Sequence, residues 1–267
     1  KENCSLLLGK QSAFQDCKNG LTAKNSFLHS KESHDEARKG EEFSCTEAGA
    51  ESSSMQQGDG LDSDKFDSVS KHLIVVDKSR NMIVGTYRLL FSAAVNQIGF
   101  YSEHIFDIQN IKRIDGALLE LGRSCIHKDY RKTAVINLLW NGIAWQIKEH
   151  EVKYLFGCPR LDTLNPHEVN EACALLRQKY YSHEEFRVYP LPKNTFSGLD
   201  ESVVCVNQRK VFRSLSPLMK GYLHLGAIVC GQPAMDHEFN TVVFFMLLPI
   251  EKIASPYKRH FFGNEVQ

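Results

Sequence analysis

Apolar segments between positions 72 and 158, separated by polar turns and loops, predict the strands of a sheet. The Lys-Ser-Arg-Asn turn at residues 78–81 joins the first two strands into a hairpin. The last strand is short and almost wholly apolar, as expected for a strand covered on both faces. The predicted strands are residues 72–77, 82–90, 119–126 and 154–158.

Apolar residues recur at helical spacing in three further stretches, and Pro217 and Gly226 mark the start and end of the last one. Residues 227–230 and 241–248 are predicted to form a final pair of strands. Because helices alternate with strands while two hairpins intrude, the sequence predicts an α/β (α+β) fold with a mixed sheet flanked by helices. The predicted helices are residues 133–150, 166–180 and 215–224.

The first 60 residues are polar, rich in Ser, Glu, Lys and Gly, and have few periodic apolar positions. Such a segment buries too little apolar surface to offset the entropy of ordering it. We therefore expect a poorly ordered N-terminal segment over residues 1–60 and one folded domain over residues 61–267.

The strand at residues 119–126 runs through a basic loop directly into the helix at residues 133–150. The first N–H groups of a helix have no partner within it, so beside Arg131 and Lys132 they favour a phosphate. An ordinary buried strand–loop–helix corner fits this spacing equally well.

Charged residues in otherwise apolar strands are costly unless they are paired. Glu120 is either a structural partner of Arg88 or Arg123, or a general base that takes a proton from an attacking amine. Asp64 and Asp67, in an acidic loop before the first strand, are the predicted partners of both arginines. Strict alternation places Glu120 and Arg123 on opposite faces of their strand.

Composition disfavours nucleic-acid-binding, metal-binding and membrane-spanning proteins. Lys and Arg total 32, as do Asp and Glu, so charge gives no indication of nucleic-acid binding. The eight cysteines form no C-x-x-C pair, so we expect reduced thiols and no metal site. No segment resembles a signal peptide, and the apolar run at residues 242–248 is too short to span a bilayer. We expect a cytoplasmic protein.

Three familiar catalytic arrangements are excluded or disfavoured. His72 and Asp77 fit the His-x4-Asp motif of glycerolipid acyltransferases, but on a strand two residues five apart point to opposite faces. No G-x-S-x-G sequence is present. Cys125 has no histidine at a telling spacing, so a packed thiol is favoured over a nucleophile.

Two surface and core features have both an ordinary and a functional interpretation. The basic patch of Lys128, Arg131 and Lys132 is either simply solvated or a docking site for an acidic carrier protein. Several apolar residues either line an acyl tunnel or form ordinary core. These are Phe100, Tyr101, Phe106 and residues 244–248.

The chain resembles a known family in a series of short segments that occur in the same order over residues 62–262. Three of them are GTYRLL (85–90), ELGRSCIHKDYR (120–131) and LLWNGIA (138–144). The others are residues 66–67, 72–77, 99–103, 154–158, 222–227, 233–236 and 259–261. Through these segments the chain resembles the GNAT superfamily, and within it the N-acyltransferases that make lyso-ornithine lipids. Acyl-homoserine-lactone synthases are more distant relatives.

The resemblance implies a splayed, GNAT-like sheet. It also implies transfer of a long (3-hydroxy)acyl chain from acyl carrier protein to the α-amine of ornithine or a similar amino acid, the first step of ornithine lipid biosynthesis. The donor substrate is then the acyl-phosphopantetheine of the carrier, with no separate cofactor. The implied partners are the carrier protein, the amino acid and, through the lipid product, the membrane surface.

The site residues implied by the resemblance form three groups. The catalytic residues are Glu120 and Arg123. The substrate-binding residues are Asp64, Asp67, Arg88, Ser124 and Asp236. The residues that bind the acyl carrier and its pantetheine are Cys125, Ile126, Lys128, Arg131 and Lys132.

Two features depart from the family pattern. The arginine-containing first helix of such enzymes corresponds to residues 39–50, where the arginine is not at its expected place. Ala134 and Ile136 stand where two glycines usually bind pyrophosphate, which fits a carrier-bound donor better than coenzyme A. A lactone-type signal synthase and a non-catalytic module that binds carrier or lipid are the alternatives.

Overall fold

The computed structural model describes residues 4–9, 63–95, 97–131 and 134–262. The described residues form two compact units that are interleaved in sequence. The first unit contains residues 4–9, Ser63–Leu90 and Leu121–Gln146, and the second contains Phe91–Glu120 and the residues from Ile147 onward. The predicted degenerate first helix, residues 39–50, lies outside the described residues.

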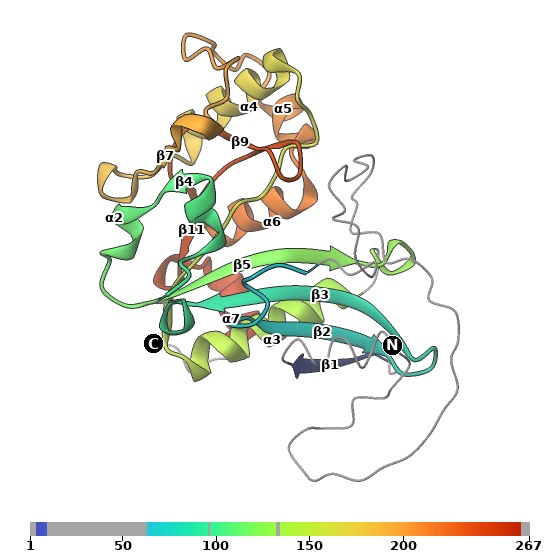
Figure 1. Cartoon of the computed structure of the whole chain (residues 1–267). Helices are drawn as coiled ribbons and strands as arrows, with labels where there is room; N and C mark the ends of the chain where they lie inside the picture. The colour runs from blue at the N-terminus through green and yellow to red at the C-terminus, as the bar shows by residue number, and fades with distance from the viewer. Residues whose placement is uncertain (1–3, 10–62, 96, 132–133, 263–267) are drawn as a thin grey trace. The chain divides into compact units, whose positions relative to one another are not determined.

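The first unit is built on strands β1 (Cys4–Gly9), β2 (Lys71–Asp77), β3 (Met82–Phe91) and the second half of β5 (Ala117–Ile126). β2 pairs antiparallel with both β1 and β3, and Figure 1 shows β2, β3 and β5 in this order. β1 lies within the segment that the sequence predicts to be poorly ordered. Its three leucines give it the apolar content of a strand.

Helix α3 (Val135–Glu149) packs against β3 of this unit at its N-terminal half. The contact requires a glycine on the strand. A Cβ atom on Gly85 would lie 2.6 Å from Val135 Cγ1 and 3.2 Å from the Leu139 side chain. Val135 and Leu139 are fully buried there, so helix and strand approach closely over the missing side chain.

The second unit has its own run of strands, ordered β5, β6 (Val152–Gly157), β11 (Met246–Pro249) and β8 (Ile228–Val229). β5 and β6 are parallel, whereas β11 is antiparallel to both β6 and β8. The parallel ladder covers only Ala117 to Glu120 of β5. The predicted mixed sheet with flanking helices is therefore confirmed.

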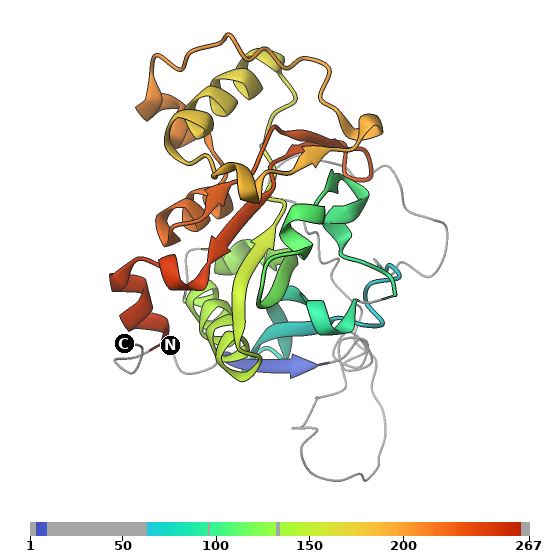
Figure 2. The ribbon, with the colours of Figure 1, turned by 90° about the vertical axis from the view of Figure 1, so that its left-hand side faces the viewer.

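The remaining elements of the second unit surround these strands (Figure 2). Helices α4 and α5 lie side by side. The further strands are β4 (Phe106–Asp107), β7 (Tyr189–Pro190), β9 (Ala234–Asp236) and β10 (Thr241–Val243). The helices are α2 (Gln109–Lys112), α4 (Pro166–Lys179), α5 (Gln208–Ser214), α6 (Pro217–Leu225) and α7 (Ser255–Phe262).

Aromatic side chains form the core of the second unit. Phe156 stacks on Phe245 with ring centroids 5.3 Å apart, and Phe100 and Phe106 pack edge-on against this pair. All four rings are buried. The candidate tunnel residues Phe100 and Phe106 are thus part of a packed aromatic core.

The prediction of one strand over residues 241–248 is wrong. β10 pairs with β9, and β11 pairs with β8, so the chain changes partner at Phe244 and Phe245. An apolar run has no internal signal for such a change, because both halves are buried.

Helix α5 was also not predicted from the sequence. Asn207 caps it by accepting a hydrogen bond from the Lys210 N–H at 3.0 Å.

Candidate functional site

Two aspartates and two arginines form an ion-pair network in the first unit. Arg88 Nη1 lies 2.7 and 2.6 Å from the two oxygens of Asp64 and 3.3 Å from Asp67 Oδ1. Arg123 Nη2 donates to Asp64 Oδ2 at 3.1 Å. The predicted partnership of these arginines with Asp64 and Asp67 is confirmed, and we call these four residues the arginine–aspartate network.

The turn before β2 fixes the two carboxylates. The Phe66 N–H donates to Asp64 Oδ1, and the Asp64 N–H donates to Asp67 Oδ2, each at 2.9 Å. Phe66 is buried, and the Arg88 guanidinium lies 5.5 Å from its ring centroid. An apolar anchor between two acids therefore orients both towards the same arginine.

The network also sets the protonation of its members. Burial alone raises the pKa of Asp64, but the hydrogen bonds and charge of Arg88, together with Arg123, outweigh it and hold the pKa below its ordinary value. Burial lowers the pKa of His72, against the opposing charge of Asp67, whose Oδ1 lies 3.5 Å from the ring. His72 is therefore neutral at pH 7, and it has no part in a His-x4-Asp motif, because Asp77 instead accepts from the Tyr130 hydroxyl.

Arg123 breaks the alternation of β5. Its φ of +47° is rare for a residue with a Cβ atom. A Cβ atom on Gly122 would lie 3.9 Å from Arg88 Nε, and Arg123 contacts Asp64, which Arg88 also binds. The prediction that strict alternation holds through this strand is therefore wrong at Arg123, where the backbone turns the guanidinium towards the network.

Glu120 is buried in the second unit, with 4% of its surface exposed. Its Oε2 accepts the N–H of Tyr101 at 2.8 Å and its Oε1 accepts the N–H of Ser102 at 2.9 Å. These N–H groups belong to the first turn of the short helix at Tyr101–His104. The backbone thus fixes both carboxylate oxygens, and the sequence carried no signal for this contact across 18 and 19 residues.

Asp236, at the end of β9, is the second buried acid of this unit. Its Oδ2 accepts from the Tyr101 hydroxyl at 3.3 Å, and the same hydroxyl lies 3.2 Å from Glu238 Oε2. Burial raises the pKa of Asp236, against the lowering effect of backbone N–H groups of Phe239 and Glu238. Within the described residues no cationic side chain pairs with Asp236.

The thiol of Cys158 lies within electrostatic range of both buried acids. Burial raises the pKa of Cys158 well above its ordinary value, and the charges of Glu120 and Asp236 act in the same direction. Cys158 is thus a neutral thiol at pH 7. We refer to Glu120, Cys158, Asp236 and Glu238 as the acidic cluster.

The residues predicted to bind the donor lie around the end of β5 in the first unit. Cys125 is buried, Ser124 and Ile126 are half-buried, and Lys128 is exposed. The exposed Arg131 donates from Nε to the Ile126 carbonyl oxygen at 3.3 Å. Lys132 lies outside the described residues.

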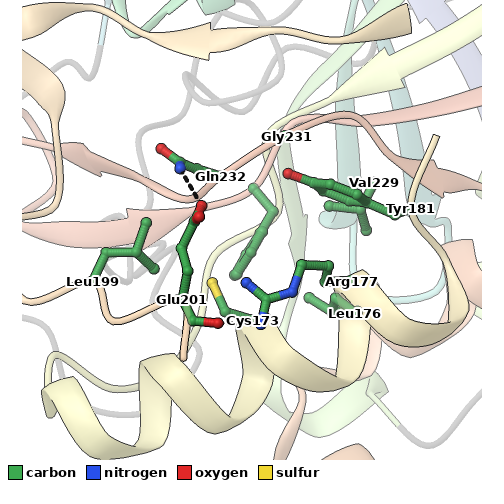
Figure 3. A pocket seen from close by; sticks show the side chains of 10 residues that line it. Cys173, Leu176, Arg177, Tyr181, Leu199, Glu201, Val229, Gly231 and Gln232 are labelled. Carbon is green, nitrogen blue, oxygen red and sulfur yellow. Dashed lines mark hydrogen bonds between the residues drawn. The ribbon is translucent and has the colours of Figure 1, made fainter. Parts of the chain in front are cut away.

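A small cleft occurs elsewhere, between α4 and the loop that precedes α5 (Figure 3). Its lining includes Cys173, Arg177, Tyr181, Glu201 and Gln232. None of the predicted site residues lines it. Burial raises the pKa of Cys173 to about 12, so its thiol is unreactive at neutral pH.

Neither a metal site nor a membrane span is found in the described part of the chain. No three His, Cys, Asp or Glu side chains there are grouped to hold a metal ion. No helix there combines the length and the apolar character needed to cross a bilayer.

Comparison with known proteins gives consistent matches. The profile of the acetyltransferase (GNAT) domain matches residues 41–141. The L-ornithine N(alpha)-acyltransferase of Brucella abortus is 33% identical over 220 residues, which cover 79% of this chain and 78% of the relative. That of Agrobacterium fabrum is 35% identical over 212 residues, which cover 76% and 72%.

Among solved structures, the AHL synthase LasI is 8% identical and covers 99% of this chain and 97% of its own, with a TM-score of 0.45. The sequence relatives exceed 30% identity over more than two thirds of both chains. The chain therefore belongs to the family of the L-ornithine N(alpha)-acyltransferases within the GNAT superfamily, and it is an acyltransferase.

Proposed function

We propose that this acyltransferase moves a long (3-hydroxy)acyl chain from acyl carrier protein to the α-amine of ornithine or a similar amino acid. The product is a lyso-ornithine lipid or a related N-acyl amino acid, made in the first step of ornithine lipid biosynthesis. The names of the relatives support the acceptor. The observation that carries the chemistry is the buried carboxylate of Glu120, held at both oxygens by backbone N–H groups.

Glu120 is the proposed proton acceptor. As the amine nitrogen bonds to the thioester carbonyl carbon, it must lose a proton, which the Glu120 carboxylate takes directly or through water. The C–S bond then breaks, and the phosphopantetheine sulfur leaves and is protonated to the thiol. Each Glu120 oxygen accepts one backbone N–H group, from Tyr101 or from Ser102.

Asp236 is one candidate for binding the acceptor. Asp236 is buried and has no cationic partner among the described residues, so a substrate ammonium group would compensate its charge. Arg123, with 23% of its side chain exposed against 4% for Arg88, is the arginine better suited to contact a substrate carboxylate. Asp64, Asp67 and Arg88 then hold Arg123 in place, and Ser124 lies next to it on β5.

The donor is proposed to bind at the end of β5. Cys125 and Ile126 would contact the pantetheine arm, while Lys128, Arg131 and Lys132 would bind its phosphate or acidic residues of the carrier protein. The exposure of Lys128 and Arg131 supports this role. A carrier-bound donor needs no nucleotide site, which suits a loop with Ala134 and Ile136 in place of glycines.

Expression in a bacterial host that lacks ornithine lipids tests the proposal. Lipid mass spectrometry should detect N-acylated ornithine in cells expressing the wild-type chain and little of it in cells expressing Glu120→Gln at equal protein level. Accumulation of an acyl-homoserine lactone would contradict the proposal in favour of a signal synthase. Absence of any acylated amine from cells with folded protein would contradict it as well.

A further inference from the structure

Two aliphatic side chains project from the loop before α5. Val204 is 66% exposed and Val206 is 90% exposed, whereas Cys205 between them is only 4% exposed. An extended segment alternates its side chains in this way, so the buried thiol anchors the loop and directs both valines outward. Val206 is the most exposed large apolar residue in the described part of the chain.

The loop is held in this conformation. Arg177 Nη2, from α4, donates to the carbonyl oxygens of Glu201 and Val203 at 2.7 and 3.3 Å. The Glu201 carboxylate accepts from Gln232, as the dashed line in Figure 3 shows. Asn207 caps the helix that follows. The valines are therefore presented by a fixed backbone on both sides.

The segment that follows the valines in the chain is cationic. The chain from Ser202 to Met235 contains no Asp or Glu, but includes Arg209, Lys210, Arg213 and Lys220. Arg209, Lys210 and Arg213 belong to α5 and are exposed, and within the described residues none of them makes an ion pair. The nearby α4 adds no net charge, since Glu168 and Glu171 balance Arg177 and Lys179.

A single exposed valine is unremarkable on a protein surface. Two valines on a rigid loop beside three unpaired cations form the combination that binds lipid bilayers. Aliphatic groups enter the boundary between headgroups and acyl chains while cations contact the anionic headgroups. We propose that Val204, Val206 and the cationic face of α5 dock this protein on an anionic lipid membrane.

An acidic protein partner would also match the cations, but the valines favour the bilayer. The core of a protein interface is a contiguous apolar patch, whereas Val204 and Val206 project singly on either side of the buried Cys205. This inference goes beyond the proposed function and does not depend on it. If the acyl transfer is as proposed, membrane docking would deliver a product with a long acyl chain to the phase in which it is soluble.

Co-sedimentation of the full chain with vesicles tests the proposal. Wild-type protein should bind vesicles containing phosphatidylglycerol and fail to bind vesicles of phosphatidylcholine alone. Arg209→Gln with Lys210→Gln should weaken binding roughly 25-fold, because each cation contributes about five-fold near an anionic surface. Val204→Ser with Val206→Ser should weaken it on the order of ten-fold.

Matched controls are Lys148→Gln with Lys252→Gln, which remove two exposed cations from other elements, and Leu164→Ser, which removes another exposed aliphatic group. These should bind like wild type. Failure of the wild type to bind anionic vesicles, or unchanged binding by the valine and α5 variants, would overturn the proposal. It would also be overturned if those variants lost activity on acyl carrier thioester without vesicles, since the surface would then dock the carrier.

Discussion

The two groups of buried charges in this protein are stabilised by different means. In the arginine–aspartate network of the first unit, side chains neutralise one another, and Arg88 contacts both Asp64 and Asp67. In the acidic cluster of the second unit, backbone N–H groups and a tyrosine hydroxyl hold Glu120 and Asp236. The carboxylates of the first arrangement face guanidinium cations, whereas the hydrogen bonds described for the second come from neutral donors.

The pKa shifts express the same difference. Arginines hold the pKa of Asp64 below its ordinary value despite its burial, so this carboxylate stays ionised. Burial raises the pKa of Asp236, whose ionised form is therefore less stable in the folded chain. A substrate ammonium would compensate this charge, whereas the Asp64 charge is already compensated.

The largest expected effect is that of Glu120→Gln on turnover. If Glu120 accepts the amine proton, turnover should fall roughly 10²–10⁴-fold and recover in part at high pH, where the free amine is abundant. The amide nitrogen cannot accept one of the two N–H groups, so the variant should also lose about 1–3 kcal/mol of stability. Turnover per folded molecule, with melting measured on the same preparation, separates the two effects.

Glu103→Gln is the matched control for that variant. Glu103 accepts the Phe100 N–H at 2.8 Å in the same short helix, but it also pairs with Lys112. It should lose stability without losing turnover per folded molecule. Unchanged turnover in Glu120→Gln would exclude Glu120 as the base.

Arg88→Met should have the largest effect on folding. It leaves Asp64 and Asp67 without their shared cation, which should lower the free energy of unfolding by about 3–5 kcal/mol in urea denaturation. Arg123→Met, at the more exposed arginine, should cost roughly 1 kcal/mol or less. Equal losses in the two variants would show that the network does not centre on Arg88.

Asp64→Asn should make the unfolding free energy less dependent on pH. Because the folded pKa of Asp64 lies below its reference value of 3.8, the wild type holds this stabilisation above pH 3.8 and loses it as pH falls through the folded pKa. The variant should be about 1–3 kcal/mol less stable at pH 7, with the difference shrinking below about pH 4. A difference constant down to pH 2 would contradict the assignment.

Asp236→Asn should have the smallest effect on stability and the opposite sign. With a raised folded pKa, Asp236 stabilises the fold below its unfolded pKa, and this contribution is lost as pH rises through the folded pKa. The variant should therefore gain up to about 1 kcal/mol at pH 7, while its KM for ornithine rises. Asp200→Asn, which removes a turn carboxylate whose pKa is lowered by the hydrogen bonds that it accepts from Ser202, should lose stability instead.

The sequence allowed the prediction of those features that follow from local pattern or from the cost of an unpaired charge. Apolar runs bounded by turn residues located β2, β3 and β6, and an arginine within an apolar strand required an acid, which led to Asp64. Helical spacing and Gly226, which has a φ of +107°, located α6.

Features that depend on distant backbone could not be predicted. Nothing in the residues around Glu120 indicates that two N–H groups, 18 and 19 positions earlier, would bind its oxygens. The positive φ of Arg123 is equally hidden, because residue type would favour the neighbouring Gly122 for that conformation. Tertiary packing decides both, and both shape the candidate site.

The most direct test of the account uses purified protein with 3-hydroxyacyl carrier protein and ornithine, with the product identified by mass spectrometry. Free carrier thiol should be released in a one-to-one ratio with N-acylated ornithine, and coenzyme A thioester should be a poorer donor. Binding of the carrier without consumption of its thioester, or equal use of coenzyme A thioester, would contradict it.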